Sequence, residues 1–196
     1  EASLIAYLWP LLIVLFSSLL PGERLRSGHV IGALVGFAGA GLIVTGGGAG
    51  FQAKAITGYL IALACALTWS TYSVMSRRFG TVPTASVAIF CIASAALSVP
   101  LHLAFETTAW PVGTTGWASA ILLGLGPVGL AFYVWDIGVK HGDIQLLGTA
   151  SYAAPLLSTL VLILAGVAAP TWSLAIAAAL ITAGALLAAR ASLKAG

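Results

Sequence analysis

Long apolar runs alternate with short polar, Pro-rich or Gly-rich stretches along the sequence. A bilayer core about 30 Å thick needs roughly 20 apolar residues in one helix. Seven runs approach or reach that length: 3–20, 29–46, 57–76, 84–105, 115–138, 144–166 and 171–190. Backbone groups in lipid must be hydrogen-bonded within the structure, and these runs are too long and too uniformly apolar for barrel strands. The pattern therefore predicts an all-α protein, a polytopic transmembrane helix bundle with seven spans.

Composition supports a membrane protein. Hydrophobic residues make up 60% of the chain, charged residues 7%, and the mean hydropathy is +1.08. About a quarter of the residues of a soluble domain are charged, because they must face water. No basic run with interleaved aromatics is present, so we expect no nucleic-acid partner.

The sequence offers no catalytic or metal-binding motif. Cys65 and Cys91 lie in apolar runs without a CxxC pattern, and HExxH is absent. Asp136 and Asp143 are poorly spaced for a pair of carboxylates that share a proton. We therefore predict no enzyme, no cofactor and no metal.

The basic residues are distributed by membrane side. If the loops alternate, one side carries seven of the eight Lys and Arg residues: Arg24, Arg26, Arg77, Arg78, Lys140, Arg190 and Lys194. Lys54 alone falls on the other side. Cytoplasmic loops of membrane proteins carry an excess of Lys and Arg. This bias predicts a cytoplasmic C-terminus, with Glu1 near the outer face.

An internal repeat links the first span to the sixth. The segment Tyr7-Leu8-Trp9-Pro10-Leu11-Leu12 resembles Tyr152-Ala153-Ala154-Pro155-Leu156-Leu157 at an offset of 145, and the same offset pairs Gly39-Ala40 with Gly184-Ala185. A shift of five spans is odd, so the two copies cross the membrane in opposite directions. Inverted repeats of this kind occur in many secondary transporters. Spans three to five would then need counterparts before Glu1, roughly 90 residues in about three spans.

Several stretches resemble the EamA-type members of the drug/metabolite transporter superfamily. They are 6–16, 22–25, 32–41, 66–72 with the following Arg77-Arg78, and 152–157. Within that superfamily, Tyr7 and Trp9 in their setting are similar to aromatic amino-acid exporters. One departure is Gly166-Val167, where family members often carry Gly-Glu.

The resemblance implies ten helices arranged as two inverted five-helix repeats around a central cavity, in a bacterial inner membrane with both termini cytoplasmic. Residues 1–50 would be the last two helices of the N-terminal repeat, and 51–196 the complete C-terminal repeat.

Aromatic and proline residues are the candidate substrate-binding groups. Proline removes a backbone donor and bends or opens a helix, and both copies of the repeat carry one beside a tyrosine. In the third span, aromatic residues at i and i+3 share one face with polar neighbours. The predicted substrate-binding residues are Tyr7, Trp9, Pro10, Trp69, Tyr72, Ser73, Tyr133, Tyr152 and Pro155. Interfacial aromatics and ordinary packing kinks are the alternative interpretation.

Asp136 is the one acidic residue well inside an apolar run. An acid within the membrane is a functional candidate, here for binding a substrate ammonium or carrying a coupling proton. It also lies four residues before Lys140, a spacing at which an ion pair forms on a helix. A structural role is therefore the alternative.

Glycines mark two further features. Gly28, Gly32 and Gly36 recur every four residues, which is typical of close helix packing, either within the protein or in a dimer. Glycines around Pro127 in the fifth span predict a bent or discontinuous helix, which in a transporter can mark a binding site.

Together these features predict a secondary transporter that exports small solutes by alternating access, most consistent with amino acids and an aromatic preference. An exporter of other metabolites or drugs is the alternative within the superfamily. A channel or structural membrane subunit is the alternative of another class. The expected partners are a small-molecule substrate and the lipid bilayer, with a functional monomer favoured and a dimer left open.

Overall fold

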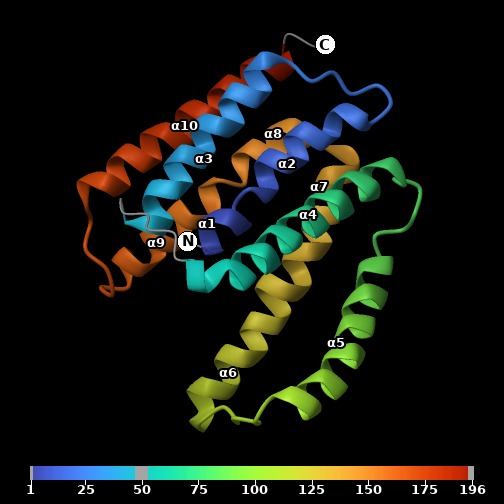
Figure 1. Ribbon diagram of the computed structural model, residues 1–196, viewed down its shortest axis with the longest axis vertical. Helices are drawn as coiled ribbons and strands as arrows, with labels where there is room; N and C mark the ends of the chain where they lie inside the picture. Colours follow the sequence, from blue (N-terminus) through green and yellow to red (C-terminus); the bar gives the residue numbers. More distant parts are fainter. Residues whose placement is uncertain (1, 47–52, 194–196) are drawn as a thin grey trace.

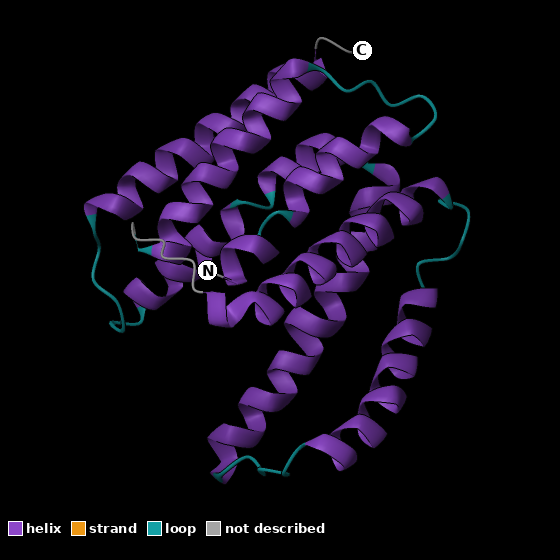
Figure 2. Ribbon diagram, in the orientation of Figure 1, coloured by secondary structure: helices purple, strands orange, loops and turns teal. Residues whose placement is uncertain are grey.

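The computed structural model describes residues 2–46 and 53–193, which are helical with no strand among them (Figure 2). The described residues contain seven helical segments long and apolar enough to cross a membrane, as predicted. Four are single helices: α3 (Ser27–Thr45), α4 (Ile56–Arg78), α5 (Ser86–Phe105) and α10 (Trp172–Leu193). A short 3-10 turn, η2 (Ala53–Ala55), precedes α4.

The first and sixth spans are each broken near one end. The first consists of α1 (Ala2–Ala6), α2 (Trp9–Phe16) and the 3-10 turn η1 (Ser17–Leu19), and the sixth of α8 (Ile144–Ala150) and α9 (Ala153–Leu164). Each break falls just before a proline, Pro10 or Pro155, which is tolerated in the first turn of the helix that follows. The two breaks therefore lie at positions related by the offset of 145.

The break in the first span is stabilised by the sixth. The Leu11 backbone N–H donates a hydrogen bond to the Tyr152 hydroxyl at 3.1 Å. A backbone donor left without a partner in an apolar interior is costly, so this contact supports the broken geometry.

The fifth span is continuous, so of the bent or discontinuous helix predicted from its glycines and Pro127, the discontinuous form is not found. It runs through α6 (Gly113–Leu123), the π-helical segment η3 (Gly124–Leu130) and α7 (Ala131–His141). A π turn widens the helix locally and accommodates a residue that cannot donate to the α-helical ladder. The helix therefore absorbs Pro127 without an interruption.

The helices α3 and α10 lie side by side, antiparallel, along one flank (Figure 1). Backbones approach closely where small residues meet: a Cβ added to Gly32 would lie 2.5 Å from the Gly184 carbonyl oxygen. A Cβ on Gly28 would lie 2.8 Å from the Ala191 Cβ, and one on Gly36 would lie 2.7 Å from the Tyr152 ring. The glycine series thus packs within this chain.

One close contact along this seam has an exchanged counterpart. Gly32 of α3 contacts Gly184 of α10. The repeat offset of 145 relates Gly32 to Ala177 (32 + 145) and Gly184 to Gly39 (184 − 145). Gly39 and Ala177 are also in contact, since a Cβ on Gly39 would lie 2.9 Å from the Ala177 carbonyl oxygen. If a two-fold axis relates two antiparallel helices, each contact between them has a second copy in which the two helices have exchanged roles.

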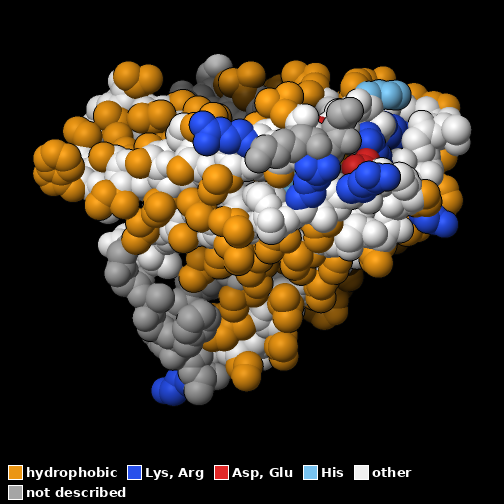
Figure 3. Space-filling model, turned by 90° about the horizontal axis from the view of Figure 1, so that it is seen from above, with side chains coloured by type: hydrophobic (Ala, Val, Ile, Leu, Met, Phe, Trp, Pro, Cys, Tyr) orange, Lys and Arg blue, Asp and Glu red, His pale blue; other side chains and the backbone are white. Residues whose placement is uncertain are grey.

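Loops that carry the basic residues meet at one end of the bundle, called here the basic end. Arg77, at the end of α4, pairs with Glu23 in the α2–α3 loop at 2.6 Å and donates to the carbonyls of Val139, Lys140 and Gly142. Ser192, near the end of α10, lies 3.3 Å from His29 at the start of α3. Figure 3 shows most of the Lys and Arg side chains of that view gathered in one area of a largely hydrophobic surface. Lys194 lies outside the described residues.

Candidate solute cavity

Four aromatic rings from three spans form a cluster in the bundle. The Trp9 ring stands edge-on to Trp69, at 6.3 Å between centroids, and to Trp135, at 5.4 Å. Trp69 lies 6.0 Å from Trp135 and 5.1 Å from Phe132. Aromatic pairs at these separations each contribute about 1 kcal/mol beyond the area that they bury. The cluster therefore joins α2, α4 and α7 into one rigid wall.

Helical spacing and a hydrogen-bond chain position these rings. Trp69 and Tyr72 lie one turn apart on α4 and stack at 5.4 Å, while Phe132 and Trp135 lie one turn apart on α7. The indole N–H of Trp135 donates to the Ser73 hydroxyl at 3.0 Å, and Ser73 in turn donates to the Trp69 carbonyl at 2.9 Å. Burying an indole N–H requires such a partner, so Ser73 fixes the orientation of Trp135.

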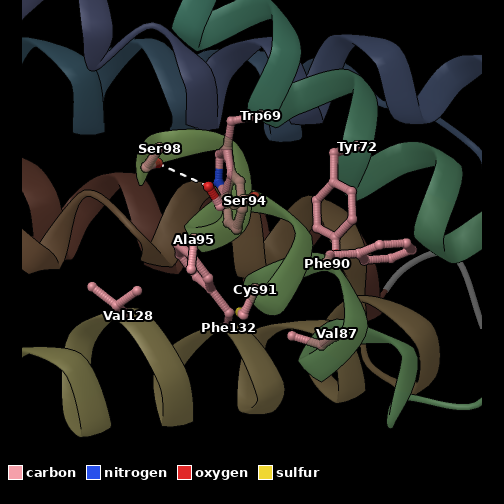
Figure 4. Close-up of a pocket in the computed structure, with 10 residues that line it drawn as sticks. All are labelled: Trp69, Tyr72, Val87, Phe90, Cys91, Ser94, Ala95, Ser98, Val128 and Phe132. Carbon is pink, nitrogen blue, oxygen red and sulfur yellow. Dashed lines mark hydrogen bonds between the residues drawn. The ribbon is translucent and has the colours of Figure 1, made fainter. Parts of the chain in front are cut away.

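A cavity of about 550 Å³ lies between this wall and α5 (Figure 4). One side is aromatic, with Trp69, Tyr72 and Phe132 from α4 and α7. The facing side is a stripe of mostly small residues at helical spacing on α5. The lining consists of Trp69, Tyr72, Val87, Phe90, Cys91, Ser94, Ala95, Ser98, Val128 and Phe132. Its volume falls within the range of small-molecule sites, roughly 300–1,000 Å³.

Two smaller spaces adjoin this cavity. One, of about 410 Å³, lies on the other side of Trp69 and Phe132 and is also lined by Trp9 and Trp135. The other, of about 170 Å³, shares Tyr72 and Phe90 with the main cavity and is lined by Asp136 and Lys140. The charged groups near the cavity thus lie beyond its Tyr72–Phe90 end, and the cavity lining itself carries no charge among the described residues.

Residues 56–190 match the model of the EamA-like transporter family. The chain belongs to the EamA-like transporter family. With seven apolar helical segments among its described residues, this EamA-like transporter-family chain is a multi-pass membrane protein.

Among its relatives is the aromatic amino acid exporter YddG of Ancylobacter novellus, with 60% identity over 190 residues, which are 96% of this chain and 66% of that protein. Exporters of the same name from Salmonella typhimurium and Escherichia coli are 25% and 24% identical, each over 81% of this chain and 56% of the relative. The EamA-like chain thus spans somewhat less than two thirds of the length of these relatives.

A solved crystal structure at 60% identity has the same fold, with a TM-score of 0.92 over 96% of this chain and 65% of the other.

The EamA-like fold brings some of the predicted site residues together. Trp69 and Tyr72 line the main cavity, Trp9 lines the adjoining one, and Ser73 supports Trp135 from behind.

Other predicted residues lie elsewhere in the EamA-like chain. Tyr152 is fully buried beside Gly36 and Phe37, and Pro10 and Pro155 are buried at the two breaks. Tyr7 is half-buried against the core around Tyr152. Tyr133 is 41% exposed and does not line the cavities described above.

Asp136 makes the ion pair with Lys140 expected from their spacing, at 2.6 Å, with both side chains 3% exposed. It also accepts hydrogen bonds from Ser76 and Thr84. Among the described residues, the acid therefore has a complete set of partners.

The sequence interpretation missed the α5 side of the cavity and Phe132. The α5 lining residues follow i, i+3, i+4, i+7, i+8 and i+11 from Val87 to Ser98, the spacing of one helix face. That spacing is visible in the sequence, but apolar residues surround it and conceal which face points inward.

Proposed function

We propose that this protein is the larger part of a secondary transporter that exports amino acids, with a preference for aromatic ones, by alternating access through the cavity beside Trp69. The observation that carries the proposal is a cavity of about 550 Å³ with an aromatic wall and no charged lining. The names of the relatives, aromatic amino acid exporters, support the same class of substrate.

The two sides of the cavity suit a planar ring with a polar edge. Trp69, Tyr72 and Phe132 offer ring faces against which an aromatic side chain stacks. Opposite them, Ser98 donates its hydroxyl to the Ser94 carbonyl, while no hydrogen bond of the Ser94 hydroxyl is found among the described residues (Figure 4). Ser94 is therefore available to an indole N–H or a phenol O–H.

The remaining predicted residues have roles around this cavity in our proposal. Trp9 belongs to the substrate path through the adjoining space. Pro10 and Pro155, with Tyr7 and Tyr152, mark the breaks at which the two spans bend during transport. Tyr133 has no role that the geometry supports.

We further propose that residues 1–50 and 51–196 belong to two inverted repeats of a ten-helix protein. The matched breaks at Pro10 and Pro155 and the exchanged contacts between α3 and α10 support this relation. The glycine seam is used within the chain, which favours a functional monomer.

The basic end faces the cytoplasm in this proposal, in a bacterial inner membrane with the C-terminus inside. Cysteines introduced at Arg78 and Thr108 test the orientation. A membrane-impermeant maleimide should label Arg78→Cys in inside-out vesicles and Thr108→Cys in intact cells. The reverse pattern contradicts the orientation.

Reconstituted flux tests the transport activity. The full-length protein in liposomes should transport labelled Trp and Phe with saturation, and Leu more slowly. Saturable flux of a cationic dye with no amino-acid flux would favour the alternative within the superfamily, an exporter of other metabolites or drugs. Flux that does not saturate would favour a channel. The absence of flux for every solute would favour a structural membrane subunit.

A further inference from the structure

Asp136 connects three segments at the basic end of the cavity. This carboxylate on α7 is 2% exposed and pairs with Lys140, one turn further along the same helix. It accepts a hydrogen bond from Ser76 on α4 and one, at 2.7 Å, from the Thr84 hydroxyl just before α5. Lys140 donates to the Val82 carbonyl at 2.8 Å. Two hydrogen bonds thus join the pair to the segment that leads into α5.

The rest of α5 is weakly held in the described chain. Val87, in its first turn, is its only residue buried among the described elements. Beyond that turn, α5 stands apart from α6, as Figure 1 shows. Among the described residues, the contacts of Val82, Thr84, Val87 and the Phe90 ring therefore hold the start of the helix.

These contacts lie directly at one end of the aromatic cavity. The small space lined by Asp136 and Lys140 shares Tyr72 and Phe90 with the cavity, and these two rings meet edge-on at 6.4 Å. From there, the cavity lining follows α5 away from the basic end, from Val87 to Ser98. Along α5, this ring pair and the polar contacts behind it lie between the cavity and the basic end.

The distribution of charge allows these contacts to separate. Both charged groups belong to α7, so they stay paired when α5 moves away. The bonds that would break each join one of these charged groups to a neutral partner, the Thr84 hydroxyl or the Val82 carbonyl. Separating a buried ion pair is strongly unfavourable, whereas losing a single hydrogen bond between a charged and a neutral group costs less.

We propose that the Asp136–Lys140 pair is a latch that holds the start of α5 against α7 and closes the basic end of the cavity, and that releasing Thr84 and Val82 opens that end. The role in transport rests on the proposed function, but the latch itself is a statement about access to the cavity. In this proposal Asp136 is part of a gate and does not bind the substrate.

Accessibility of Cys91, which lines the cavity, tests the latch. In the full-length protein, Cys65 and any cysteine outside this chain are replaced by Ala. Cys91 is then labelled with a membrane-impermeant thiol reagent from the side on which Arg78→Cys reacts. Thr84→Val removes the hydroxyl at nearly constant size, Thr84→Ser keeps it, and Thr81→Val alters an exposed threonine nearby as a matched control.

Thr84→Val should raise the labelling rate by at least about tenfold, the factor expected from one lost hydrogen bond to a charged group. Thr84→Ser and Thr81→Val should label at the wild-type rate. The latch is overturned if Thr84→Val labels no faster than Thr81→Val, or if Thr84→Ser labels as fast as Thr84→Val. Thr84→Ala serves in place of Thr84→Val if the latter does not elute as a folded protein.

This readout is independent of the substrate. A labelling shift without any amino-acid flux in the wild type would sustain the latch and reject the proposed function. Normal amino-acid flux without a labelling shift would reject the latch and sustain the proposed function.

Discussion

At the scale of single residues, Trp69 is the centre of the aromatic wall. It contacts the rings of Trp9, Tyr72, Phe132 and Trp135, and it lines both the main cavity and its neighbour. Its removal therefore takes away a stacking surface on two sides at once.

We expect Trp69→Ala to raise the KM for Trp transport about tenfold, since one stacking partner and its apolar area are lost. Trp69→Phe should keep most of the affinity. Trp117→Ala is the matched control, because Trp117 stacks on Trp110 away from the cavity. Equal KM values for Trp69→Ala and Trp117→Ala in liposome flux would contradict an aromatic substrate wall.

Ser94 should influence selectivity rather than overall flux. Ser94→Ala should reduce Trp transport by a factor of about five while leaving Phe unchanged, because only the indole has an N–H to donate to the hydroxyl. Competition between labelled Trp and Phe measures the ratio, with Phe as the internal control. An equal loss for both substrates would place Ser94 outside the recognition of the ring edge.

At the scale of elements, the α3–α10 seam is the closest helix contact. We expect Gly32→Ala to destabilise the folded protein by about 1–3 kcal/mol, because its Cβ would lie 2.5 Å from the Gly184 carbonyl oxygen and the helices would have to separate. Gly58→Ala is the matched control, since a Cβ on Gly58 meets nothing within 4 Å. Thermal unfolding in detergent should give a lower Tm for Gly32→Ala only; equal Tm values would contradict the tight seam.

The sequence predicted all seven spans found among the described residues, with every bound within three residues of the helical segments. Length and polar punctuation decide where a span begins and ends, and both are visible in one dimension. The sequence does not show which face of a span points inward, because lipid and the protein interior are equally apolar. Tyr133 and Phe132 illustrate this: they are neighbours in the sequence, yet Phe132 lines the cavity and Tyr133 does not.

The packing of Tyr152 was also not visible in the sequence. Its aromatic ring beside a proline predicted a cavity wall, but the ring fills the space left by Gly36 and its hydroxyl meets Leu11 on another span. Gly36 and Leu11 lie 116 and 141 positions before Tyr152 in the sequence, so the local spacing of residues around Tyr152 does not reveal these contacts. By contrast, the Asp136–Lys140 pair is local, and its i, i+4 spacing was sufficient.

At the scale of the whole molecule, Arg77 joins the basic ends of three spans. Its guanidinium pairs with Glu23 and binds carbonyls at the end of α7, where the helix dipole favours a cation. The Arg77 side chain is 24% exposed, so part of this stabilisation is screened by water.

We expect Arg77→Ala to lower the free energy of unfolding by about 2 kcal/mol through these lost charged hydrogen bonds. Arg78→Ala removes an equal charge from the exposed neighbouring position and should have little effect. Thermal unfolding of the full-length variants in one detergent compares them. A similar Tm for both would show that charge alone, not the network, matters at this end.

The hydrogen bond from Leu11 to Tyr152 has a consequence for biosynthesis. The two partners are 141 residues apart, so at about 5–20 residues per second the ribosome needs roughly 7–28 s to reach the second after the first. During that interval the broken first span sits in the membrane with a backbone donor that its final partner does not yet satisfy. The nascent chain must therefore hold this span in another state, either as an unbroken helix or with a temporary partner, and the break becomes permanent only when the sixth span arrives.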